Sequence, residues 1–155
     1  MHTGTDSKTG QPASWFNGDC GNTVSEAQSL NCSFSIVLHA WLPQDCMSDD
    51  DVEDEVAMYA NRDWHWGLEN MTEVSLETVR SGEFLSVWTS YDWHVMHCTY
   101  VWKRLHRALL AEDMKIDSYT ASYGHTKHCV EMITGQDDMH KIAGTQVFAK
   151  FPTCA

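Results

Sequence analysis

Residues 91–110 read YDWHVMHCTYVWKRLHRALL, and the two histidines and the cysteine near the start of this stretch recur further along the chain. Each copy has the form His-x-x-His-Cys, and the copies consist of His94, His97 and Cys98 and of His125, His128 and Cys129. We expect helices over residues 91–110 and 123–133. Because residues three positions apart lie on the same face of a helix, each helix presents two imidazoles side by side. Two such helices packed together would bring four imidazoles to one site.

The composition is that of one compact globular domain. The chain has 155 residues, of which 43% are hydrophobic and 21% are charged. Its seven Trp, five Tyr and five Phe supply large pieces of core, which excludes disorder for the bulk of the chain. The formal net charge of −12 excludes a nucleic-acid partner, because phosphate backbones require clustered Lys and Arg. Nine histidines are many for so small an acidic domain, and imidazole is the commonest metal ligand.

The predicted fold class is α+β, mainly α with a small β element. The expected organisation is a flexible leader over residues 1–14 and a single metal-binding domain over residues 15–155. Besides the two motif helices, we expect helices over residues 23–30, 48–63 and 73–80, and a small sheet formed by strands over residues 34–42 and 145–151. The acidic run 49–55 (DDDVEDE) is interpreted as the solvated start of its helix, whose apolar face would contain Val52, Val56, Tyr59 and Ala60.

The cysteines and two glycosylation motifs indicate the secretory pathway. An even number of six cysteines spread over the chain fits three disulfides in an oxidising compartment. Apart from the motif cysteines, the preferred pairing is Cys20–Cys32 and Cys46–Cys154, with the other connectivities left open. The N-glycosylation motifs are at Asn31 and Asn70. The longest apolar run is far too short to span a bilayer, so we expect any targeting segment to lie outside this sequence.

Three interpretations of the repeated motif compete. In the first, the motif residues are packed core and disulfide residues that repeat by chance. In the second, His94, Cys98, His125 and Cys129 form a tetrahedral Cys2His2 zinc site, which requires free thiolates. In the third, the four histidines form a redox copper site, and a disulfide between Cys98 and Cys129 holds the two helices in register.

The two motifs and the stretches around them resemble the fungal UstYa-like oxidases, in particular an uncharacterised branch of them. The matching stretches run from Cys20 to about Ile133 and are CGNTVSEAQSLNCSF, AWLPQDC, HVMHCTYVWKRLHRALL and IDSYTASYGHTKHC. The second motif continues here as HCVEMITGQ, where many members have an HCLD-x-LRQ-like run.

The resemblance implies a type II membrane protein whose lumenal domain acts in the secretory pathway. It also implies a copper-dependent enzyme that modifies peptide natural products by oxidative cyclisation, desaturation, hydroxylation or halogenation. The functional histidines would be His94, His97, His125 and His128. The implied partners are a peptide substrate, ribosomally made in many cases, and a second copy or a related oxidase; the membrane would be reached only through an N-terminal anchor.

We therefore expect one or two copper ions, with dioxygen as cosubstrate. The alternative is a non-catalytic, disulfide-bonded secreted domain with a structural zinc ion or no metal. The remaining histidines are weaker candidates. His106 is expected to be a packing or supporting residue, His39 and His65 are minor candidates for ligands, and His2 and His140 are expected at the surface.

Overall fold

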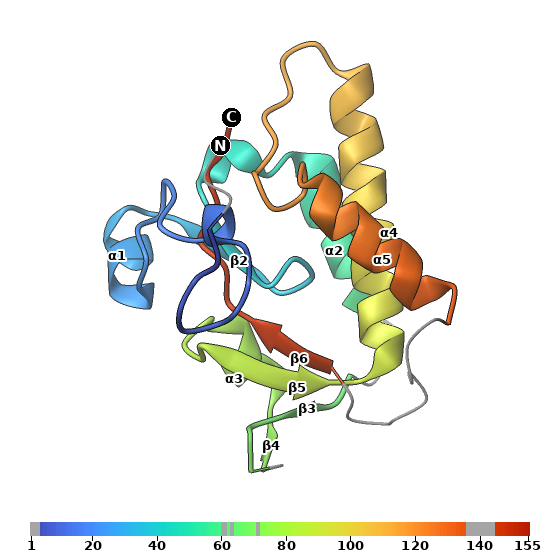
Figure 1. Cartoon of the computed structure of the whole chain (residues 1–155). Helices are drawn as coiled ribbons and strands as arrows, with labels where there is room; N and C mark the ends of the chain where they lie inside the picture. Colours follow the sequence, from blue (N-terminus) through green and yellow to red (C-terminus); the bar gives the residue numbers. More distant parts are fainter. Residues whose placement is uncertain (1–3, 60–61, 63, 71, 136–144) are drawn as a thin grey trace.

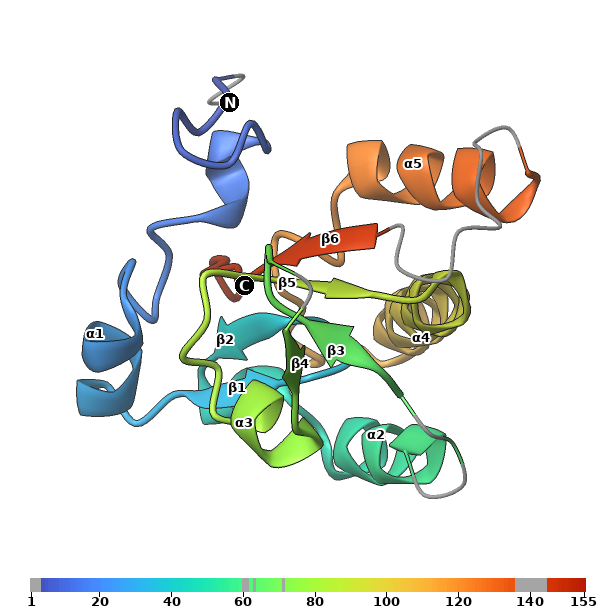
Figure 2. The same ribbon diagram turned by 90° about the horizontal axis from the view of Figure 1, so that it is seen from below.

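The two motif helices lie against each other on one side of the molecule (Figure 1). The structure is a computed structural model that describes residues 4–59, 62, 64–70, 72–135 and 145–155. In it, α4 (Tyr91–Leu110) and α5 (Tyr123–Ile133) have the bounds that the sequence predicts. Figure 2 shows α4 between α5 and α2 (Asp49–Tyr59). With five α-helices and two small sheets among the described residues, the predicted fold class is confirmed.

Each motif helix begins at a serine cap. The hydroxyl of Ser90 accepts a hydrogen bond from the backbone N–H of Trp93, and that of Ser122 accepts one from His125. Such caps satisfy one of the free N–H groups in the first helical turn and fix where the helix starts. The first turns of α4 and α5 therefore carry the first histidine of each motif.

Three disulfides cross-link the chain, and they have the preferred pairing. Cys98 of α4 is bonded to Cys129 of α5, which fastens the two motif helices together. The other two bonds are Cys20–Cys32, which closes a local loop, and Cys46–Cys154, which ties the C-terminal end to the segment before α2. No described cysteine is free.

The larger sheet lies across the end of α4 at which this helix begins (Figure 1). It is antiparallel, with the strand order β4 (Glu73–Val74), β3 (Trp66–Gly67), β5 (Ser86–Thr89) and β6 (Thr145–Phe148). A separate antiparallel hairpin pairs β1 (Ser33–Ser35) with β2 (Ala40–Leu42). The smaller helices are α1 (Val24–Ser29), α3 (Leu76–Arg80) and the 3-10 turns η1 (Ala13–Trp15) and η2 (Gln44–Cys46).

The predicted single strand over residues 34–42 is wrong, because the chain reverses within it. The turn between β1 and β2 is closed by the carboxylate of Glu55 on α2, which accepts hydrogen bonds from the backbone N–H of Ile36 at 2.8 Å and from the hydroxyl of Ser35 at 3.0 Å. His39 completes the turn with a positive φ of 55°. The backbone N–H of Ile36 thus bonds to a carboxylate from α2 in place of the neighbouring strand that a continuous strand would need.

The predicted sheet between the first and last strands is also wrong. β6 pairs with β5, and the first predicted strand pairs with the C-terminal segment through an isolated bridge between Ala40 and Lys150, outside either sheet. The predicted helix over residues 73–80 begins only at Leu76, because Glu73 and Val74 pair with β3.

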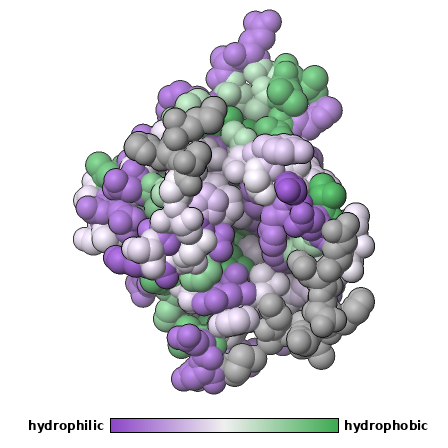
Figure 3. Space-filling model, in the orientation of Figure 1, coloured by the Kyte–Doolittle hydropathy of each residue, from purple (hydrophilic) through white to green (hydrophobic). Residues whose placement is uncertain are grey.

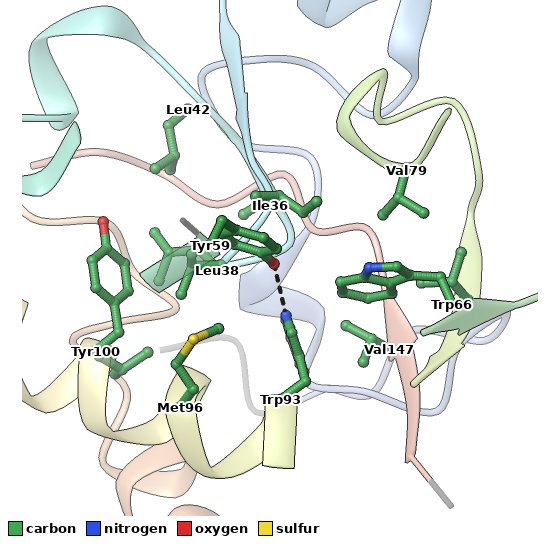
Figure 4. Close-up of a cluster of buried hydrophobic side chains, with 14 of the residues drawn as sticks. Ile36, Leu38, Leu42, Tyr59, Trp66, Val79, Trp93, Met96, Tyr100 and Val147 are labelled. Carbon is green, nitrogen blue, oxygen red and sulfur yellow. Dashed lines mark hydrogen bonds between the residues drawn. The ribbon is translucent and has the colours of Figure 1, made fainter. Parts of the chain in front are cut away.

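Large aromatic side chains fill the core between the sheet, the hairpin and α4 (Figure 4). Trp66 and Trp93 are almost fully buried, and their rings meet edge to face at 5.3 Å. The indole N–H of Trp93 donates to the hydroxyl of Tyr59 on α2 at 3.0 Å. This bond satisfies a buried polar group and ties α4 to α2.

A buried guanidinium links α4 to two other segments. Arg104 has no exposed surface, and its nitrogens lie 2.9 Å from Asp51 Oδ2 on α2 and 3.1 Å from Asp117 Oδ2 in the segment before α5. It also donates to the carbonyl oxygen of Cys46. Arg107, one turn further on, binds the second oxygen of Asp51 at 2.5 Å. The three segments are thus joined by charge-assisted bonds.

The interpretation of the acidic run as a solvated helix start is wrong at Asp51, which is fully buried. The apolar face predicted for this helix is wrong too, since Val52 and Val56 are 49% and 60% exposed. The inward face contains Asp51 and Tyr59, because the two arginines of α4 provide the partners that a buried carboxylate needs. Ala60 lies outside the described residues.

Hydrophobic and polar residues alternate over most of the face seen in Figure 3, with a green patch at the top of the view. This patch lies at the end of α4, where Leu109 and Leu110 are exposed. Within the described residues, no helix combines the length and the apolar character that a membrane span requires.

We predict that Arg104→Met lowers the free energy of unfolding by about 3–5 kcal/mol, because it leaves the buried carboxylate of Asp117 without its arginine and that of Asp51 with Arg107 alone. Lys103→Met is the matched control on the same helix. Lys103 is half-exposed and pairs with Asp54, so its loss should cost about 1 kcal/mol or less. Urea unfolding of the two variants measures both values. Equal losses would contradict a special role for the buried arginine.

Candidate metal site at two histidine pairs

The four motif histidines come together as two pairs, each with one histidine from α4 and one from α5. The ring centroids of His97 and His125 lie 5.2 Å apart, and those of His94 and His128 lie 5.3 Å apart. The pairs adjoin, since the centroids of His94 and His97 are 6.0 Å apart. We call His97 and His125 the inner pair and His94 and His128 the outer pair.

The inner pair is buried, and its reactive nitrogens face each other. His97 and His125 are 2% and 1% exposed, and their Nε2 atoms are 3.2 Å apart. His97 Nδ1 lies 2.5 Å from the carbonyl oxygen of Val37. Because a carbonyl oxygen can only accept, this Nδ1 carries the hydrogen, and Nε2 of the neutral ring keeps its lone pair. A bond of this kind, made by the far nitrogen, is what orients metal-binding histidines in proteins.

The outer pair connects the buried site to the surface. His94 is partly buried, and its Nδ1 lies 3.4 Å from the hydroxyl of Thr145 at the start of β6. His128 is exposed. A molecule that approaches from solvent therefore meets the outer pair first.

Burial keeps His94, His97 and His125 neutral. It lowers the pKa of His94 to about 2 and that of His125 to about 3, and neighbouring cationic groups add to both shifts. The pKa of His97 is also lowered, first by burial and then by His125. Neutral imidazole is the form that binds metal ions.

Two aromatic rings sandwich the inner pair. Trp93 stacks on His97 with centroids 5.0 Å apart, and Tyr119 stacks on His125 at 4.0 Å. Tyr119 also places its hydroxyl 2.9 Å from His97 Nε2. The edge of Trp15 meets the ring of Tyr119 at 4.8 Å.

A buried lysine completes the surroundings. Lys150 is 5% exposed, and its Nζ lies 4.5 Å from the centroid of the Tyr119 ring. Burial lowers its pKa to about 7. Sequence reasoning missed Lys150 and Trp15, and nothing in the local sequence pattern marks either residue.

The inner pair fits a metal ion in its donor atoms and in their separation. Two nitrogens that bind one tetrahedral ion at about 2.0–2.1 Å lie about 3.3 Å apart, close to the 3.2 Å found here. Within the described part of the chain, however, no group of three or more His, Cys, Asp and Glu side chains is arranged to hold an ion. The structure therefore places two histidine nitrogens at a separation that suits binding to one ion. The other two histidines form a neighbouring pair.

The Cys2His2 zinc interpretation is wrong. Cys98 and Cys129 are bonded to each other, so neither can bind a metal ion as a thiolate. Both glycosylation-motif asparagines, Asn31 and Asn70, are exposed; their modification stays a prediction.

The other described histidines, His39, His65 and His106, belong to neither pair. His65 is exposed and 3.2 Å from the carboxylate of Glu73, and His106 is exposed on α4. His39 is buried beside Phe34 and Trp66. His2 and His140 lie outside the described residues.

A pocket of about 980 Å³ adjoins α4 on the side of α2. Its lining includes Met58 of α2, Asp92 and Val95 of α4 and Ile133 of α5. None of the four motif histidines lines it.

Comparison with known proteins gives two relatives with the same identity and coverage. Phomopsin biosynthesis cluster proteins B and B′ of Diaporthe leptostromiformis are each 30% identical to this chain over 122 residues. The chain is homologous to proteins of a biosynthesis cluster. The alignment covers 74% of this chain and 36% of each relative, so the chain spans about a third of the length of the curated relatives it matches. No family model and no solved structure matches the chain.

We predict that His39 makes the metal-free protein less stable in acid. Burial and the nearby Lys150 lower the pKa of His39 well below 6.5, and neither ring nitrogen has a hydrogen-bond partner among the described residues. Below pH 6.5 the unfolded chain therefore binds a proton that the folded chain does not, and stability falls as the pH falls. The expected loss from this residue between pH 6 and pH 5 is about 1 kcal/mol.

His39→Asn removes the titrating group, and asparagine tolerates the positive φ at this position. Urea unfolding at the two pH values should show a smaller acid loss in this variant than in the wild type. His106→Asn, at an exposed position, should behave as the wild type does. The same acid loss in wild type and His39→Asn would refute the assignment.

Proposed function

We propose that this chain is the histidine-bearing domain of a copper-dependent oxidase of the UstYa-like type, which modifies a peptide natural product. The observation that carries this proposal is the inner pair, in which one histidine from each motif contributes an Nε2 atom 3.2 Å from the other. The two motifs are thus parts of one site. Copper suits such a site, because imidazole is among its preferred ligands in proteins.

The similarity to proteins of a phomopsin biosynthesis cluster supports the substrate class. The repeated His-x-x-His-Cys motif supports the family and the type of chemistry. Three disulfides support an oxidising compartment, in keeping with a lumenal or secreted domain. The reaction in this proposal is the oxidation of a peptide side chain by cyclisation, desaturation, hydroxylation or halogenation.

His97 and His125 would hold the copper ion, with His94 or His128 reaching it by rotation of its side chain. When bound, copper supplies the activation of dioxygen. The protein contributes the arrangement around it. The carbonyl of Val37 fixes the hydrogen of His97 on Nδ1, so that Nε2 is free to bind. The Cys98–Cys129 bond keeps the two ligand-bearing helices at a constant separation.

The peptide would enter on the side of the exposed His128. This route leaves the inner pair shielded from water by Trp93 and Tyr119, which restricts side reactions of activated oxygen. The net charge of −12 favours the approach of cationic peptides and of metal ions.

The competing proposal is a non-catalytic, disulfide-bonded domain. The observation that favours it is that the described His, Cys, Asp and Glu residues form no group of three ligands. It predicts that the protein binds no copper, or binds zinc alone.

Metal binding and redox cycling separate the two proposals. We expect purified protein to bind copper(II) and to give a paramagnetic resonance signal with nitrogen coupling. The signal should disappear on reduction with ascorbate and return in air. Changing a residue that only supports a metal ligand lowers metal affinity by about 10–100-fold. The double variant His97→Ala/His125→Ala removes two ligands and should lower copper affinity by more than that.

His65→Ala and His106→Ala are matched controls, since both histidines are exposed and lie outside the two pairs. They should bind copper as the wild type does. Stoichiometric zinc with no affinity for copper, or undiminished copper binding in the double variant, would refute the proposal.

A further inference from the structure

We propose that the phenol oxygen of Tyr119 is a third protein ligand of the metal ion held by the inner pair. This inference rests on the proposed function, because it concerns the same ion. It assigns a ligand that lies outside both His-x-x-His-Cys motifs. The site would then have two nitrogen donors and one oxygen donor from three segments: α4, α5 and the connection between them.

Two other donor atoms lie beside Nε2 of His97. His97 Nε2 lies 2.9 Å from the hydroxyl oxygen of Tyr119 and 3.2 Å from His125 Nε2. The rings of Tyr119 and His125 stack with their centroids 4.0 Å apart. Since the described His, Cys, Asp and Glu side chains give no third ligand, the phenol is the donor that already lies beside the inner pair.

Hydrogen bonding alone does not satisfy this arrangement. His97 Nε2 has one lone pair, because its Nδ1 donates to the carbonyl of Val37. That lone pair can accept one good hydrogen bond, yet both Tyr119 and His125 face it. A cation among the three atoms would take a lone pair from each of them.

The chain holds Tyr119 in place through its neighbours. The carboxylate of Asp117 accepts hydrogen bonds from the backbone N–H of Thr120 at 2.7 Å and from the Thr120 hydroxyl at 2.8 Å, and it is anchored to Arg104. The edge of Trp15 packs against the ring. Tyr119 is 4% exposed, and the only described hydrogen-bond partner of its hydroxyl is His97. A side chain fixed in this way is suited to a ligand, since little ordering remains for binding.

Copper(II) titration followed by visible absorption tests the assignment. A phenolate bound to copper(II) gives a ligand-to-metal charge-transfer band that imidazole ligands do not give. We expect this band in the wild type and its loss in Tyr119→Phe, with copper affinity lower by about tenfold or more. Tyr100→Phe is the matched control, because Tyr100 is also a buried tyrosine with a hydrogen bond, here to the carbonyl of Asp51. It should keep the band.

The outcomes separate this inference from the proposed function. If the wild type binds copper without the band, or if Tyr119→Phe keeps it, Tyr119 is not a ligand and the proposed function stands. If the wild type binds no copper, both fail. Thermal unfolding of the metal-free variants shows whether Tyr119→Phe is folded, and absence of the band from copper-loaded wild type overturns the assignment whether or not it is.

Discussion

The buried guanidinium of Arg104 joins the parts of the chain that surround the histidines. It binds Asp51 of α2 and Asp117 of the segment before α5. Taking these charges out of water costs free energy. This desolvation cost is offset only because the carboxylates and the guanidinium satisfy one another. Asp117 in turn accepts two hydrogen bonds from Thr120. The position of Tyr119, which lies between these two residues, therefore depends on an arginine four turns along α4 from the start of that helix.

The disulfide between the motif helices constrains the site in a complementary way. Cys98 directly follows His97, and Cys129 directly follows His128. The covalent bond therefore lies within about one helical turn of the motif histidines. Arg104 fixes the far part of α4, and the disulfide fixes the part that carries the histidines. Together they leave α4 and α5 little freedom to slide, which keeps the two Nε2 atoms of the inner pair close together.

The sequence was most informative where the signal is local. The two motif helices α4 and α5 are predicted correctly, and the even number of cysteines predicts the three disulfides. The errors arise where a distant partner decides. The strand expected over residues 34–42 is broken because Glu55, which lies 19 positions after Ile36, closes the turn. Asp51 is buried because Arg104 meets it, and no periodicity within α2 reveals that.

The same distinction applies to the site. The motifs name four histidines, but their division into an inner and an outer pair depends on how α4 crosses α5. Tyr119 stood out in the sequence only as one of many aromatic residues near the motifs. Its contact with His97 requires the turn that Asp117 and Thr120 build. Lys150 comes from the C-terminal segment, and the pairing of this segment with residues far away in the sequence, such as Ala40, brings it beside Tyr119.

Buried histidine nitrogens also have a cost for folding that the rest of the molecule must offset. His125 Nδ1 and both ring nitrogens of His39 are buried without a hydrogen-bond partner among the described residues. Each unsatisfied buried group costs about 1–3 kcal/mol. A purely structural core would replace such groups by apolar residues at no loss. In this chain they occur together with three disulfides, whose stabilisation helps to offset their cost.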